Sequence, residues 1–141
     1  MKKALFFFVM IVCLLWTTVV FAELKEGLWE ITTQVEMKGM PQSMPPTTFR
    51  QCITKSNPVP QNKDKNFECK IISQKVSGGT VSYQVECTGK EGVVQTSGTT
   101  TYTDKAMNGA STTSFKMKGQ PAMTMSNKIR GKYIGPCPKA Q

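Results

Sequence analysis

Few residue types in this chain could do chemistry, because its 141 residues include no histidine. That absence removes the commonest general base and the usual imidazole ligand of zinc and copper(II). The nine acidic residues are scattered, and Asp64 and Glu68 lie in or beside a polar stretch that they would solvate. The chain also contains no glycine-rich phosphate-binding loop. We therefore expect no catalytic residues and no enzymatic activity.

Methionine is the residue type best suited to hold a metal. Met37, Met40 and Met44 recur in a short segment that also contains glycine and proline, so a turn could bring their three thioethers together. Soft thioethers select copper(I) or silver(I), which makes this segment a candidate copper(I) site. The alternative interpretation is packing, in which flexible methionines fill gaps in the core of a bent sheet. The methionines that would do so are Met37, Met117, Met123 and Met125.

Residues 1–22 have the three parts of a secretory signal peptide: two lysines, an apolar run, and small residues before Glu23. We expect cleavage after Ala22, leaving a single domain, residues 23–141, in the periplasm or outside the cell. The alternative is an uncleaved membrane anchor, since the apolar stretch approaches the roughly 20 residues that span a bilayer. We expect no transmembrane segment after cleavage.

The charge of the exported domain suggests its partners. The leader contains two of the 18 basic residues, so the remaining 16 and the nine acidic residues leave a net charge of +7. A basic exported domain meets anionic envelope components before it meets nucleic acid. We expect no nucleic-acid partner.

Four of the five cysteines lie outside the leader. An even number in an oxidising compartment predicts disulfides, and the wide spacing lacks the close C-x-x-C pairs of a zinc site. The four are Cys52, Cys69, Cys87 and Cys137.

Threonine, valine, serine and glycine dominate the domain, and no long segment has helical periodicity. Alternating apolar residues predict strands at 29–37, 47–53, 67–77, 80–88, 93–103, 107–118 and 123–134, with a polar loop at 54–66. The fold class is all-β. About seven antiparallel strands should form an up-and-down meander that closes into a barrel or a strongly bent sheet to hide its edges.

The Gly78-Gly79 turn bears on the disulfide pairing. A two-residue turn gives the hairpin an apolar face that includes Ile72 and Val76. It places Cys87 on this face and Cys69 on the other. This favours Cys52–Cys69 with Cys87–Cys137. The alternative, Cys69–Cys87 with Cys52–Cys137, requires a bulge in the hairpin.

Basic residues alternate with other residues along the last two predicted strands. If these strands pair, five charges share the outer face and could bind lipid head groups or a cell-wall polymer, more weakly as salt rises. The alternative is an ordinary solvated face that discourages edge pairing. The five are Lys116, Lys118, Lys128, Arg130 and Lys132.

The order of several short motifs resembles an uncharacterised bacterial exported family, domain of unknown function 3617. The resemblance implies an exported β-rich domain with a cysteine framework, and it brings no activity and no catalytic residues. The motifs are Leu24 to Thr32, Met37-x-x-Met40-Pro41, Gln51-Cys52-Ile53-Thr54, Cys69, Cys87-Thr88-Gly89 and Gly131-x-x-Ile134-Gly135-x-Cys137-Pro138.

Gly27-Leu28-Trp29 is also similar to the Gly-x-Trp start of lipocalins, whose barrels hold apolar ligands. This resemblance implies a small apolar ligand or lipid, for which Trp29, Tyr83 and Tyr133 are the candidate contacts. The alternative is that Trp29 plugs one end of the barrel. We therefore expect an exported binding protein without a cofactor, and copper(I) binding is the alternative.

Overall fold

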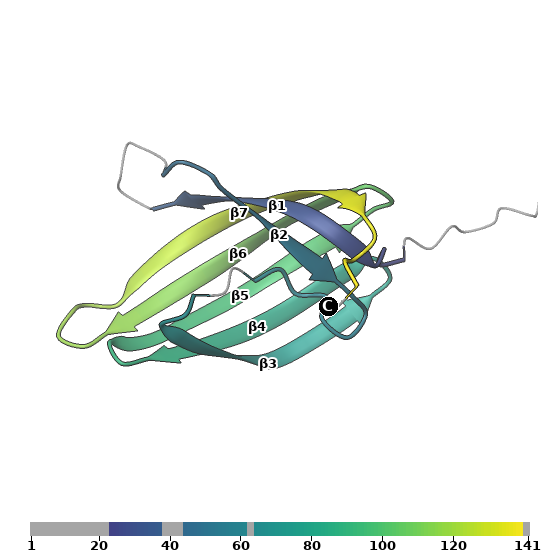
Figure 1. Cartoon of the computed structure of the whole chain (residues 1–141). Helices are drawn as coiled ribbons and strands as arrows, with labels where there is room; N and C mark the ends of the chain where they lie inside the picture. Colours follow the sequence, from purple (N-terminus) through teal and green to yellow (C-terminus); the bar gives the residue numbers. More distant parts are fainter. Residues whose placement is uncertain (1–22, 38–43, 62–63, 140–141) are drawn as a thin grey trace, which may run out of the picture.

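The computed structural model describes residues 23–37, 44–61 and 64–139. They form one antiparallel sheet of seven strands, curled into a half-barrel (Figure 1). The strands are β1 (Gly27–Glu36), β2 (Thr47–Ile53), β3 (Phe67–Ser77), β4 (Thr80–Gly89), β5 (Gly92–Tyr102), β6 (Ala106–Met117) and β7 (Met123–Gly135). The all-β prediction and the order of the strands are confirmed. The predicted signal peptide lies outside the described residues. Within them, no helix is long and apolar enough to cross a membrane.

The sheet is a meander that stays open at one seam. Its order is β2-β1-β7-β6-β5-β4-β3, so the first strand pairs with the last, and the two edges are β2 and β3. Every pairing is antiparallel. Following these pairs from β2 round to β3 shows that the two edge strands run in the same direction. The seam therefore cannot close as one more antiparallel pair.

The loop between β2 and β3 follows from this geometry. A chain that leaves one strand and enters another running the same way must return along the length of the sheet, which takes a dozen or more residues. The described part of this return, residues 54–61 and 64–66, crosses the open seam (Figure 1). Pro58 and Val59 in this loop are fully buried. The polar, proline-containing segment thus covers the inside of the half-barrel.

Glycines on β5 and β6 leave room for inner-face side chains of the neighbouring strand. A Cβ atom at Gly98 on β5 would lie 2.6 Å from the hydroxyl oxygen of Tyr83 on β4. A Cβ atom at Gly109 on β6 would lie 2.7 Å from Oγ1 of Thr100 on β5. Real Cβ atoms do not approach so closely, so a side chain at either position would force its neighbours to move. Glycine at such points also permits a sheet to bend sharply.

The disulfide pairing that we preferred from the sequence is wrong. The structure has Cys52–Cys137 and Cys69–Cys87. The Gly78-Gly79 turn forms as predicted and pairs Ser77 with Thr80. However, the register of β3 shifts by one residue between Ile71 and Ser73.

This bulge at Ile72 explains the error. A bulge moves the rest of a strand to the opposite face, so Cys69 comes to lie directly opposite Cys87. It also leaves Ile72 59% exposed, whereas the sequence had placed it on the buried apolar face. Val76, expected on the same face, is 46% exposed because β3 is an edge strand. The hairpin alternative with a bulge is therefore confirmed.

Buried apolar side chains fill one end of the half-barrel, which we call the core end. Here β2 ends, β1 begins, and the loop residues Pro58 and Val59 close the inside. Trp29 is fully buried and packs edge-on against the rings of Tyr102 and Tyr133, with ring centroids 5.4 and 5.7 Å away. The core cluster is Leu24, Trp29, Ile31, Ile53, Val59, Val81, Tyr83, Val85, Tyr102, Met107 and Ile129.

Candidate ligand-binding cavity

A cavity of about 630 Å³ lies between the inner face of the half-barrel and the returning loop. Its apolar walls are the side chains of Phe67 and Val85, the ring of Tyr83, and the Cys69–Cys87 disulfide. The volume is within the usual range of small-molecule sites. The strand order places this cavity beside the open seam, because β3 is the free edge of the sheet.

The loop over the cavity is fixed by one buried and two partly buried hydrogen bonds. Tyr102 donates its hydroxyl to the carbonyl oxygen of Pro58 at 2.7 Å. The side chain of Gln51 donates to the carbonyl oxygen of Val59 at 3.0 Å and accepts from the backbone N–H of Gln61 at 2.8 Å. Burial raises the pKa of the Tyr102 phenol, so this donor keeps its proton. The roof of the cavity is therefore held at the core end.

A belt of polar side chains crosses the cavity floor. Asn127 on β7 donates from Nδ2 to the hydroxyls of Ser111 at 3.2 Å and Thr113 at 3.0 Å, both on β6. The Thr113 hydroxyl in turn shares a 3.0 Å hydrogen bond with the hydroxyl of Thr96 on β5. Three adjacent strands thus present a connected network, which we call the polar belt. Asn127, Thr113 and Thr96 all line the cavity.

The ionisable groups of the cavity are confined to its mouth. Asp64, Lys65 and Glu68 line it, and all three residues are exposed. The floor and the inner walls contain no Asp, Glu, Lys or Arg among the described residues that line it. The interior is therefore uncharged but not wholly apolar.

The three aromatic candidates from the sequence occupy different places. Tyr83 lines the cavity and is 4% exposed, and burial raises the pKa of its phenol. Trp29 and Tyr133 instead pack together at the core end. Trp29 also donates its indole N–H to the carbonyl oxygen of Lys25 at 3.1 Å. Their positions match the plug interpretation, and of the three it is Tyr83 that reaches the cavity.

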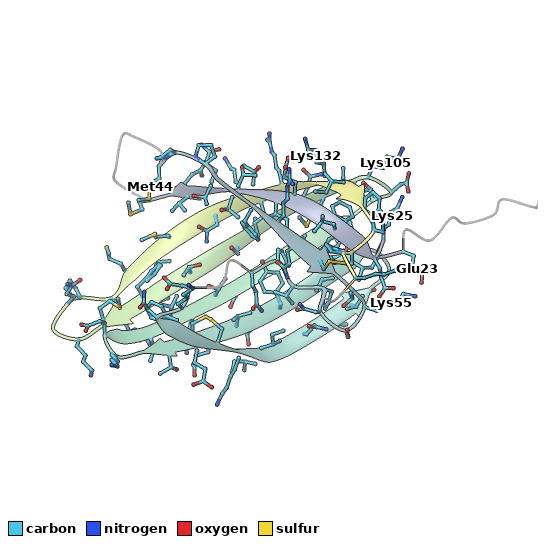
Figure 2. All side chains as sticks on the ribbon, viewed as in Figure 1. Glu23, Lys25, Met44, Lys55, Lys105 and Lys132 are labelled. Atoms are coloured by element: carbon cyan, nitrogen blue, oxygen red, sulfur yellow. A yellow bond between two sulfur atoms is a disulfide. The ribbon has the colours of Figure 1, made fainter. Side chains whose placement is uncertain are left out.

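Met107 is buried in the core, but other methionines lie at the opposite ends of the strands, which we call the methionine end. Met123 is 48% exposed and Met125 is half-buried, and both alternate with outward-facing residues on β7. The β1–β7 ladder ends at Glu36 and Ser126, so the next step would set Met37 beside Met125. Met44 is 45% exposed and lies far from Lys25 and Lys55 (Figure 2). Met40 lies outside the described residues.

The predicted basic residues do not form one cluster. Strands β6 and β7 do pair, but Lys128 lies opposite Ala110 and Arg130 opposite Asn108. Lys116 is therefore six residues along β6 from the level of Lys128, which is about 20 Å at the usual rise. Lys118 lies beyond the end of β6.

Glutamates on β1 also neutralise part of this outer face. Lys128 forms an ion pair with Glu36 at 2.6 Å, and Lys132 forms one with Glu30 at 3.2 Å. Glu30 also contacts Arg50 at 3.2 Å. Hydrogen bonds from Lys132 and Arg50 lower the pKa of the Glu30 carboxyl. The anion-binding interpretation stays a prediction, on a face more balanced in charge than expected.

The outer face contains a second hollow, of about 810 Å³. Its floor is made of short hydroxyl and amide side chains such as Ser82, Ser97 and Thr112, with Lys75 and the Glu36–Lys128 pair among its lining residues. It lies on the exposed side of the sheet and has no roof like the loop that covers the inner cavity. The inner cavity is the better candidate site because it offers both enclosure and apolar walls.

Sequence reasoning missed most of the cavity residues. Thr33, Thr96, Thr113 and Asn127 are polar residues at positions where the alternation of β1, β5, β6 and β7 requires the inner face. A polar residue at such a position was the available signal. Phe67 could not be found in this way, since its place depends on the bulge in β3.

Comparison with known proteins gives one match. Residues 24–137 match the family described as "Protein of unknown function (DUF3617)". The chain belongs to this family. The match includes all seven strands and all four disulfide cysteines. No curated protein and no solved structure matches the chain.

Proposed function

We propose that this DUF3617 protein is an exported binding protein that holds a small apolar or amphipathic ligand inside its half-barrel. The observation that carries the proposal is the cavity of about 630 Å³ under the returning loop. Burial of apolar surface supplies about 25 cal/mol per Å², and Phe67, Val85 and Tyr83 offer such surface. The protein acts by binding and not by catalysis.

The disulfides support an exported location. Bridges such as Cys52–Cys137 and Cys69–Cys87 persist in oxidising compartments and are rare in the cytosol. Together with the leader at residues 1–22, they favour the periplasm, and the extracellular space is the other candidate. In either place the open seam between β2 and β3 gives a ligand access to the cavity.

Titration with the uncharged fluorescent probe N-phenylnaphthylamine tests the proposal. The full chain would be expressed, and the protein purified from the oxidising compartment of the host. We expect saturable fluorescence enhancement in the wild type. Thr33→Phe, which places a ring in the cavity, should weaken binding by about 10-fold or more, the effect of losing roughly 1.4 kcal/mol.

Thr32→Phe is the matched control, because Thr32 is the neighbouring residue on β1 and its side chain bonds Thr48 on the outer face at 2.9 Å. It should leave probe binding unchanged. Absence of probe binding to the folded wild type would refute the proposed function. Equal effects of the two substitutions would place the probe elsewhere.

A second candidate function is copper(I) or silver(I) binding through thioethers. The observation that favours it is the end of the β1–β7 ladder at Glu36 and Ser126. If the same register continued by one residue, Met37 would lie opposite Met125. Silver(I) titration by calorimetry tests it. Met37→Leu and Met125→Leu should each weaken binding, and Met107→Leu, at the buried core end, should not. Unchanged affinity in the first two variants would end this candidate.

A further inference from the structure

The polar belt limits which class of ligand the cavity can hold. Its side chains do not use all of their hydrogen-bond donors and acceptors on one another. The Nδ2 group of Asn127 has two hydrogens, and it uses both on Ser111 and Thr113. Its Oδ1 atom accepts no hydrogen bond from the described residues and stays available as an acceptor.

The threonine pair leaves a donor in the same way. Thr96 and Thr113 have two hydroxyl hydrogens between them and share a single hydrogen bond. Whichever hydroxyl donates, one hydroxyl hydrogen of the pair remains unused. The cavity floor therefore offers an acceptor on β7 and a donor on β5 or β6.

A pure hydrocarbon would exclude water from this acceptor and this donor without forming a hydrogen bond to either. A buried polar group without a partner destabilises the complex, so such a ligand would bind poorly over the belt. A charged head group fits no better. The ionisable residues that line the cavity, Asp64, Lys65 and Glu68, are exposed at its mouth, and burying an ion without a partner is costly.

The remaining surfaces define the rest of the ligand. Apolar walls at Phe67 and Val85 flank the belt on the β3–β4 side. Half-buried Met125 and Phe115 continue the inner face toward the methionine end. At about 30 Å³ for each water-sized group, a cavity of about 630 Å³ holds roughly twenty non-hydrogen atoms.

We propose that the cavity selects an uncharged amphiphile with hydroxyl or ester groups, the chemistry of a glycerol ester of a medium-length fatty acid. This inference rests on the proposed function and specifies its ligand. The hydroxyl and carbonyl groups of the ligand bond Asn127 and the Thr96–Thr113 pair. Its chain contacts Phe67, Val85 and the Cys69–Cys87 disulfide.

Displacement of bound N-phenylnaphthylamine by two lauroyl compounds tests this selection. 1-Monolauroylglycerol is uncharged, and laurate is anionic at pH 8. Both would be used below their micellar concentrations. We expect half-displacement by monolauroylglycerol at a concentration at least about 10-fold lower than by laurate. The comparison is stringent, because the positive net charge of the protein attracts the anion.

A pair of valine substitutions on β5 tests the belt itself. Thr96→Val removes a belt hydroxyl with little change of shape and should weaken monolauroylglycerol binding about 2- to 10-fold, the effect of one neutral hydrogen bond. Probe binding should not fall. Thr99→Val is the control, since the Thr99 hydroxyl contacts Ser82 on the outer face at 3.4 Å. It should change neither affinity.

Each result decides between the two proposals. Equal or tighter binding of laurate would overturn the selection of an uncharged ligand while leaving the cavity in use. If Thr96→Val and Thr99→Val weakened monolauroylglycerol binding equally, the role of the belt would be overturned. Failure of the probe to bind the wild type would instead overturn the proposed function. Because the wild-type comparison needs no variant, the inference remains testable if Thr96→Val does not fold.

Discussion

The two disulfides should contribute unequally to stability, because they close loops of different length. In the chain-entropy description, a crosslink stabilises the native state by restricting the unfolded chain, and the effect grows with the logarithm of the loop length. Cys52 and Cys137 are 85 residues apart, and Cys69 and Cys87 are 18 apart. These separations correspond to about 4.6 and about 3.2 kcal/mol at 25 °C. The expected difference is about 1.4 kcal/mol.

Urea unfolding of paired alanine variants measures this difference. Cys52→Ala with Cys137→Ala removes the bridge from β2 to the C-terminal segment, and Cys69→Ala with Cys87→Ala removes the bridge within the β3–β4 hairpin. With a urea slope of about 1–3 kcal/mol per M, the first variant should unfold about 0.5–1.4 M earlier than the second. Equal midpoints, or the reverse order at equal slopes, would refute the loop-length reasoning.

The two disulfide variants should rank in the opposite order for loss of ligand affinity. The Cys69–Cys87 bridge lines the cavity and fixes the edge strand β3 to β4, whereas Cys52–Cys137 does not line it. Under conditions where both variants are folded, the hairpin variant should bind N-phenylnaphthylamine several-fold more weakly. The other variant should bind it as the wild type does. If the Cys52–Cys137 variant loses mainly stability and the Cys69–Cys87 variant loses mainly affinity, the two bridges have separate roles in folding and in binding. Parallel losses would show that affinity merely follows stability.

Three further outcomes follow from the core and the inner face. Tyr102→Phe removes the donor to the buried carbonyl of Pro58 and should lower the free energy of unfolding by about 1–3 kcal/mol; a calorimetric loss under about 0.5 kcal/mol would contradict this. Gly98→Ala places a Cβ atom 2.6 Å from the Tyr83 hydroxyl and should cost about 1–3 kcal/mol, while Ser97→Ala, on the exposed side of β5, should change stability by less than about 0.5 kcal/mol. Burial raises the pKa of Tyr83 and Tyr102 above that of an unfolded tyrosine, so the native state retains protons that the unfolded state loses. Stability should therefore be constant up to about pH 9 and fall as the pH rises above about 10; urea midpoints measured between pH 8 and 11 check this, and Tyr102→Phe should show the smaller fall.

The sequence was sufficient to predict the strands, because alternation is a local property. The turn at Gly78-Gly79 and the buried side of Trp29 and Ile31 also follow from near neighbours along the chain. The pairing of the cysteines does not follow from near neighbours along the chain. It depends on a single extra residue at Ile72, which reverses the face of everything before it in β3. No local pattern marks that residue, because Ile71 and Ile72 suit either face.

The candidate site shows the same division. Thr96, Thr113 and Asn127 are far apart in the sequence, and only the register of β5, β6 and β7 places their side chains within hydrogen-bonding distance. The register also separated basic residues that the sequence had grouped, since Lys116 and Lys128 lie at different levels of the paired strands. Residue types reveal what chemistry is available, and the register decides which groups meet.

By itself, the sequence determined the all-β class, the approximate positions of the strands, the oxidised cysteines and the family, since each depends on composition or local order. The tertiary structure decided that the sheet stays open between β2 and β3. The physical reason is that these two edge strands run the same way, so the chain must return over the inner face to join them. Four described residues of that return, Pro60, Gln61, Asp64 and Lys65, line the cavity.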